Sequence, residues 1–253
     1  MDCILDVDLL FLLIAAIGII KEKGPNFVTK FNVLCSGVII SKWYILTAAH
    51  CFKEEEGHPL RPTDVIFGDN EVPSDSVFSE TRKILTVEKH PFFNYPQYYY
   101  DIAIITVHKE INFNSRIRPI CLNTKETSYP GLSITVQGWG GTGEDKKELS
   151  EIKTTTWKKE ACDQRTNSVA KSNPRIKQTK KDFMPQLTDD VLFCAADPFD
   201  PKVHTCNGDS GGPAIQRFGF LAAKAQLNKC TCALSVRPSV SKLNKSSYFR
   251  VKL

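Results

Sequence analysis

Short apolar segments, separated by turn residues, run through most of the chain. They are rich in β-branched and aromatic residues and show no helical periodicity, so they predict antiparallel strands and an all-β fold. The predicted strands lie at Val38–Ile40, Trp43–Leu46, Val65–Phe67, Ile84–Val87, Ile102–Val107 and Ile134–Val136. The hydrophobic pattern therefore indicates the fold class before any motif is considered.

The amino-terminal segment allows two interpretations. Leu9 to Ile20 is uncharged and apolar, which suits either a buried strand or the hydrophobic region of a signal peptide. A membrane-spanning helix needs about 20 apolar residues, so no membrane span is expected. Acidic residues precede the run, whereas a signal peptide carries positive charge there, and turn-forming residues follow at 23–26. We therefore favour the strand.

Composition narrows the class of protein. A chain of 253 residues with 42% hydrophobic and 24% charged residues can bury a sizeable core, and we expect one domain. The net charge of +5 is spread along the chain. The acid-free basic stretch Lys171–Lys181 is typical of a solvated loop, and we expect no nucleic-acid partner. Nine cysteines indicate a secreted, extracellular protein, and the odd number leaves one thiol over or paired with another chain.

Residues 208–213, Gly-Asp-Ser-Gly-Gly-Pro, surround one serine with glycines. Nucleophilic attack on a peptide carbonyl needs an activated hydroxyl, a base, and hydrogen-bond donors for the oxyanion. Glycines let the backbone turn so that the amides of Gly208 and Ser210 point at one spot while the Ser210 hydroxyl faces outward. Taken alone, the stretch also fits a hairpin loop.

Two further stretches supply the other groups. In residues 47–51, Thr-Ala-Ala-His-Cys, small residues leave room around His50. In residues 100–105, Asp101 enters an apolar strand, where burial of a carboxylate without a partner is costly. An imidazole N–H is the natural partner and fixes the imidazole tautomer. The histidines at 58, 90 and 108 are interpreted as structural.

Together, TAAHC, DIAII and GDSGGP, in this order, resemble the motifs of the trypsin-like serine proteases of peptidase family S1. Residues 35–41, 90–94, 118–122 and 136–140 also match, so the resemblance is clear over residues 14–215. It implies two six-stranded antiparallel β-barrels with the active site between them. We expect an atypical segment at residues 1–11 and one protease domain over 12–253.

The resemblance also assigns roles to residues. It implies that Ser210 is the nucleophile, His50 the general base and then acid, and Asp101 the group that orients His50, with the oxyanion bound by the amides of Gly208 and Ser210. This mechanism needs no metal or cofactor. The implied disulfides are Cys35–Cys51, Cys162–Cys194, and Cys206 with Cys230 or Cys232. Cys121 needs an upstream partner, for which Cys3 is the only candidate.

Three features depart from the family pattern. In the family, an amino terminus made by cleavage pairs with the aspartate before the catalytic serine, here Asp209, but no activation sequence of that kind precedes residues 12–18. This difference predicts a zymogen-like chain. Residues 218–253 lack the family's Ser-Trp-Gly strand and closing helix. His204 stands at the base of the specificity pocket, where trypsin-specific relatives carry aspartate, so cleavage after Arg or Lys is not predicted.

Two functions are compatible with these residues. The first is a secreted serine endopeptidase that hydrolyses protein or peptide substrates through an acyl-enzyme intermediate, with an activating protease and protein inhibitors as further partners. The alternative is a non-catalytic or zymogen-like homologue that acts as a binding or regulatory protein. The complete set of His50, Asp101 and Ser210 favours the enzyme.

Overall fold

A computed structural model provides the fold. It describes residues 13–21, 30–52, 61–72, 76–93, 100–120, 122, 130–141, 148–158, 160–161, 164, 192–196, 205–216, 223–225 and 249–252. Nearly all elements in these ranges are strands, and they form two antiparallel arrays. Within the same ranges, no helix is long and apolar enough to cross a membrane. The structure thus confirms the all-β class.

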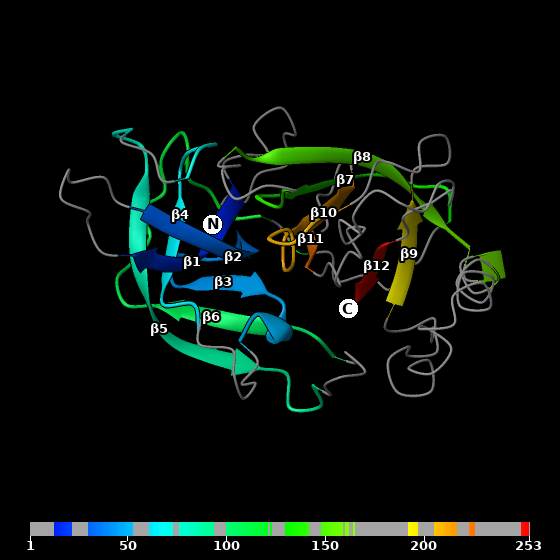
Figure 1. Cartoon of the computed structure of the whole chain (residues 1–253), viewed down its shortest axis with the longest axis horizontal. Coiled ribbons are helices and arrows are strands. Elements are labelled where there is room, and N and C mark those ends of the chain that lie inside the picture. The colour runs from blue at the N-terminus through cyan, green and yellow to red at the C-terminus, as the bar shows by residue number, and fades with distance from the viewer. Residues whose placement is uncertain are drawn as a thin grey trace, which may run out of the picture.

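The first array is a closed barrel with the strand order β1-β2-β3-β6-β5-β4, at the left of Figure 1. The barrel closes because β1 pairs with both β2 and β4. Its strands are β1 Ile14–Lys21, β2 Lys30–Ile39, β3 Tyr44–Thr47, β4 Asp64–Phe67, β5 Glu80–Lys89 and β6 Ala103–Val107. The apolar amino-terminal run is therefore a strand over Ile14–Lys21, as interpreted, while residues 9–12 lie outside the described residues.

The first half of β1, Ile14 to Ile17, is buried on both faces of the strand, which explains why these four residues are all apolar. Ala15 and Ile17 point into the barrel core, where they pack with Ile45 and Phe67. Ile14 and Ala16 point the opposite way and join a second cluster that includes Trp139. Alternate residues of a strand face opposite sides, so a strand covered on both sides carries apolar residues at every position.

The second array is a six-stranded sheet with the order β11-β10-β7-β8-β9-β12, at the right of Figure 1. Its edge strands β11 and β12 contact one another, so the sheet curls toward a barrel. The strands are β7 Ser133–Gly138, β8 Ser150–Trp157, β9 Leu192–Ala196, β10 Pro213–Gln216, β11 Ala223–Ala225 and β12 Phe249–Lys252. Two six-stranded antiparallel arrays are therefore confirmed, and the divergent segment 218–253 supplies both edge strands of the second.

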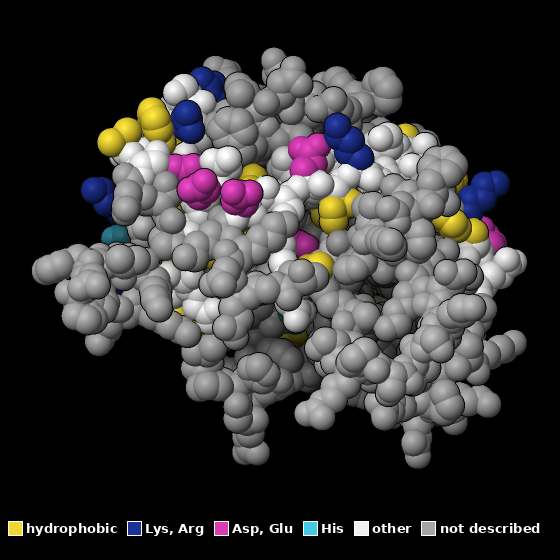
Figure 2. Space-filling view, turned by 45° about the horizontal axis from the view of Figure 1, so that its top comes forward, with side chains coloured by type: hydrophobic (Ala, Val, Ile, Leu, Met, Phe, Trp, Pro, Cys, Tyr) yellow, Lys and Arg dark blue, Asp and Glu magenta, His cyan; other side chains and the backbone are white. Residues whose placement is uncertain are grey.

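Charged side chains of both signs are interspersed on the surface. Figure 2 shows Lys and Arg side chains at several separate places on the described part of one face, with Asp and Glu side chains between them. One ion pair joins Lys83 Nζ to Asp64 Oδ1 at 2.8 Å, and another joins Lys42 Nζ to Glu110 Oε1 at 2.6 Å. Both side chains of the Lys42–Glu110 pair are exposed, and exposed pairs contribute little to stability, about 0–1 kcal/mol each, whereas the carboxylate of Asp64 is buried.

One disulfide fastens the short 3₁₀ helix η2, Ala49–Phe52, to the barrel. Cys35 of β2 and Cys51 of η2 form it, with Cα atoms 6.2 Å apart, so the expected bridge is present. Cys194 of β9 is also disulfide-bonded. Its expected partner Cys162 lies outside the described residues, as do the cysteines at 3, 121, 230 and 232. The pairings of Cys194, Cys206 and Cys121 therefore stay predictions.

Replacing both Cys35 and Cys51 with alanine is expected to lower the free energy of unfolding by about 3 kcal/mol. The bridge closes a loop across a sequence separation of 16, and its loss releases the chain entropy of that loop in the unfolded state. Urea denaturation of the variant and of the parent chain measures the difference. Non-reducing peptide mapping of the parent should recover the two cysteines linked, and two free thiols in secreted material would contradict the assignment.

Candidate active site

The strand register brings the segments that carry His50 and Asp101 to the same end of the barrel. Thr47, the last residue of β3, pairs with Ala103, the first residue of β6. Because the two strands are antiparallel, the chain leaves β3 toward His50 at the place where it enters β6 from Asp101. The two side chains therefore meet although they are 51 residues apart.

Asp101 binds His50 at two points. The backbone N–H of His50 donates to Asp101 Oδ1 at 2.7 Å, and His50 Nδ1 lies 2.7 Å from Asp101 Oδ2. The carboxylate is 0% exposed, so these contacts compensate a charge that is otherwise costly to bury. A carboxylate can only accept, so Nδ1 carries the hydrogen and Nε2 is left as the acceptor.

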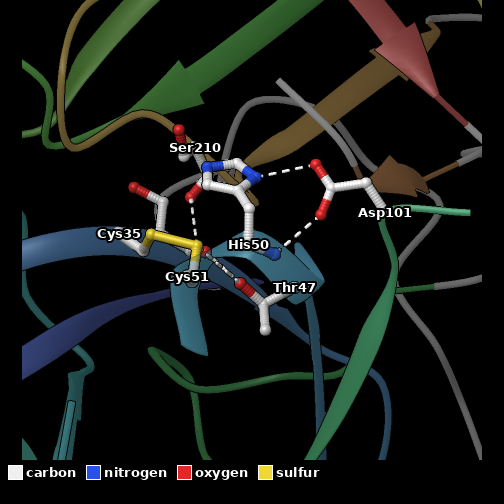
Figure 3. Close-up of polar contacts among 7 residues, drawn as sticks. Cys35, Thr47, His50, Cys51, Asp101 and Ser210 are labelled. Carbon is white, nitrogen blue, oxygen red and sulfur yellow. Dashed lines mark hydrogen bonds and ion pairs between the residues drawn. A yellow bond between two sulfur atoms is a disulfide. The ribbon is translucent and has the colours of Figure 1, made fainter. Parts of the chain in front are cut away.

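Ser210 lies on the other side of the His50 ring from Asp101 (Figure 3). It belongs to a turn in which the amide of Asp209 donates to Cys206 O at 3.1 Å and the amide of Gly212 donates to Asp209 O at 2.9 Å. Gly208 has φ of +102° and Gly211 has φ of +83°, a backbone region that side chains disfavour. The structure thus brings together all three residues that the sequence motifs singled out.

Asp209, between the two expected oxyanion donors, is buried and hydrogen-bonded through both carboxylate oxygens. Gly140 N–H donates to Oδ1 at 2.6 Å and Cys206 N–H donates to Oδ2 at 2.6 Å. These backbone amides supply charge-assisted hydrogen bonds to the buried carboxylate. The zymogen-like character expected from the missing activation sequence stays a prediction.

The glycines of residues 138–140 make room for this carboxylate. A Cβ on Gly138 would lie 2.3 Å from Asp209 Oδ1, and one on Gly140 would lie 2.3 Å from Asp209 Cγ. Contacts this short are excluded for real side chains, so both positions require glycine. Sequence analysis had noted the Gly-Trp-Gly segment only as a family match. Its contact with Asp209 has no signal in the sequence, since the residues lie 69 positions apart.

Two features expected from the sequence lie outside the described residues. They are His204, the expected base of the specificity pocket, and the basic stretch Lys171–Lys181. Among the described residues, Cys35, His50 and Cys51 place possible metal-ligand atoms close together. Both sulfurs belong to the disulfide, so this group offers no thiolate to a metal ion.

Comparison with known proteins identifies the family. The family model described as Trypsin matches residues 22–243 of the chain. The chain belongs to the trypsin family of serine proteases. The match covers the segment from β2 to β11, including the motifs around His50, Asp101 and Ser210. The trypsin-like resemblance of the sequence is confirmed.

Individual relatives agree with this assignment. The chain is similar to the proclotting enzyme of Tachypleus tridentatus, with 31% identity over 207 residues, 78% of this chain and 49% of that protein. It is similar to the clotting factor G beta subunit of the same organism, with 29% identity over 79% of this chain and 60% of the relative. Serine protease snk of Drosophila melanogaster is 30% identical over 71% of this chain and 38% of its own length. The chain thus spans about half the length of these curated relatives.

Proposed function

We propose that this chain is a secreted serine endopeptidase that hydrolyses peptide bonds of protein or peptide substrates through an acyl-enzyme intermediate. The supporting observation is the two-point contact between His50 and Asp101, with Ser210 on the far side of the imidazole. A carboxylate that fixes the Nδ1–H tautomer leaves Nε2 free to take a proton from a serine hydroxyl. Membership of the trypsin family supplies the reaction class.

Each residue has one task in the proposed reaction. Ser210 Oγ forms a bond to the substrate carbonyl carbon, and its proton passes to His50 Nε2. The amides of Gly208 and Ser210 bind the oxyanion. His50 then gives its proton to the leaving amine as the peptide bond breaks. In the second half, water loses a proton to His50, attacks the ester carbon and releases the acid, and the proton returns to Ser210 Oγ. Asp101 stays ionised and holds the imidazolium throughout.

Labelling with a fluorophosphonate probe tests this proposal directly. Such a probe phosphonylates an activated serine, so mass spectrometry of the full chain should find the label on the peptide that contains Ser210. Ser210→Ala should lose both the label and hydrolysis of a peptide library, because only the nucleophile is removed. The variant should unfold at the urea concentration of the parent. Equal labelling of the variant would contradict the assignment of Ser210 as the nucleophile. An unlabelled parent chain would favour the non-catalytic homologue.

Secretion is supported by cysteine chemistry. Cys35 and Cys51 form a disulfide, and Cys194 is also disulfide-bonded. Disulfides persist in oxidising compartments and are rare in the reducing cytosol. An activating protease and protein inhibitors remain the partners proposed for this chain beside its substrates. Expression in a secreting cell line, followed by detection of the oxidised chain in the medium, tests this part of the proposal.

A further inference from the structure

Ser36 of β2 lies at the junction of the two arrays. Its neighbour Cys35 points into the barrel core, and alternate strand residues face opposite sides, so Ser36 points outward toward the turn that carries Ser210. The other array covers it there, and Ser36 is 0% exposed. A buried hydroxyl is costly unless it is hydrogen-bonded, which makes its partners informative.

Ser36 holds the carbonyl groups on both sides of Asp209. Its hydroxyl donates to Gly208 O at 2.7 Å, and its amide donates to Ser210 O at 2.8 Å. The hydroxyl also accepts from the amide of Trp139 at 3.3 Å. Since the Trp139 amide occupies an acceptor site of the oxygen, the one hydroxyl hydrogen is directed at Gly208 O.

These two contacts fix the peptide planes next to the amide of Ser210. Peptide groups are planar, so holding Gly208 O fixes the plane that joins residues 208 and 209, and holding Ser210 O fixes the plane that joins 210 and 211. The plane between them carries the Ser210 N–H. Gly208, with φ of +102°, has wide rotational freedom without such contacts.

We propose that the Ser36 hydroxyl is a positioning residue that holds the turn 208–210 in the geometry needed to bind the oxyanion. This inference rests on the proposed function for its catalytic consequence, because the oxyanion arises only in that reaction. Ser36 touches neither substrate nor reacting atoms. It acts through Gly208, from a strand 172 residues earlier in the chain.

The test compares Ser36→Ala and Ser36→Gly with the parent chain in two measurements. The first is the rate of fluorophosphonate labelling as a function of probe concentration, which separates the limiting rate from the half-saturating concentration. The second is amide hydrogen exchange, followed by mass spectrometry over residues 205–216 and over the barrel strands. Alanine removes the hydroxyl and keeps the Cβ, and glycine serves as the second variant because it removes the hydroxyl without leaving a methyl group facing Gly208 O.

Both variants should label about 10- to 100-fold more slowly at saturation, with an unchanged half-saturating concentration, because a misplaced oxyanion donor affects the transition state and not the binding of the probe. Amide exchange over residues 205–216 should be about tenfold faster, because the loss of one buried hydrogen bond makes local opening about ten times more frequent. The amides of β4 and β5 should keep the exchange rates of the parent. Thr156→Val is the matched control: it removes a hydroxyl that accepts from the amide of Leu132, away from the turn, and should leave labelling unchanged.

Each other outcome overturns the inference. Parental exchange over residues 205–216 would show that the hydroxyl does not hold the turn. Faster exchange throughout the barrel would show general destabilisation, and faster local exchange with parental labelling would show that the turn's position does not matter to the reaction. If the parent chain itself is not labelled, the proposed function fails, and the exchange measurement alone then decides whether Ser36 holds the turn.

Discussion

Asp101→Asn is expected to lower kcat for peptide hydrolysis by about 10⁴-fold at neutral pH. Asp101 Oδ1 accepts from the backbone N–H of His50, so the single oxygen of the asparagine amide must take that place. Its NH₂ group then faces His50 Nδ1. A donor at that point forces Nδ1 to be the acceptor and puts the hydrogen on Nε2, where the imidazole can no longer accept the serine proton.

Steady-state kinetics on a generic peptide library measure this effect, with unfolding by urea as the check on the fold. Asp64→Asn is the matched control, because Asp64 is a carboxylate of the same barrel, 1% exposed, that pairs with Lys83 and not with the site. Its kcat should equal that of the parent. If Asp101→Asn kept kcat within tenfold of the parent, His50 would not act as the base in the way proposed.

Gly211→Ala is expected to lower the free energy of unfolding by about 3–5 kcal/mol. Gly211 has φ of +83°, and a Cβ there would lie 2.2 Å from Thr47 Oγ1 and 2.4 Å from Ser36 O. The substitution combines backbone strain with a clash against β2 and β3. Neither strand can retreat easily, because both belong to the closed barrel.

Gly131→Ala separates the two causes. Gly131 has φ of +84°, nearly the same as Gly211, but a Cβ there would meet nothing within 4 Å. Its alanine variant therefore carries the backbone strain alone and should lose only about 1 kcal/mol. Urea unfolding, followed by tryptophan fluorescence, gives both values. Equal losses in the two variants would contradict the packing explanation for the second glycine of the motif.

The predicted strands illustrate what local sequence can determine. All six runs identified from β-branched and aromatic residues overlap strands of the structure, four of them (β3, β4, β6 and β7) within one or two residues at both ends, whereas β2 and β5 begin well before the predicted runs. By contrast, β8 to β12 were not predicted. Strand β8, Ser150–Trp157, is mostly polar and only partly buried, and β11 has three residues. Such strands are stabilised by pairing with their neighbours, and that pairing leaves little trace in their own composition.

The sequence by itself determined the residues of the candidate site, because nucleophilic chemistry restricts which residue types can act and the motifs place them in recognisable surroundings. His50, Asp101 and Ser210 followed from those motifs. Only the tertiary structure decided how the site is held: the amides of Gly140 and Cys206 on Asp209, and the Ser36 hydroxyl on Gly208. Backbone amides have the same chemistry at almost every residue, and these partners lie up to 172 positions apart, so the contacts exist only once the two arrays have packed together.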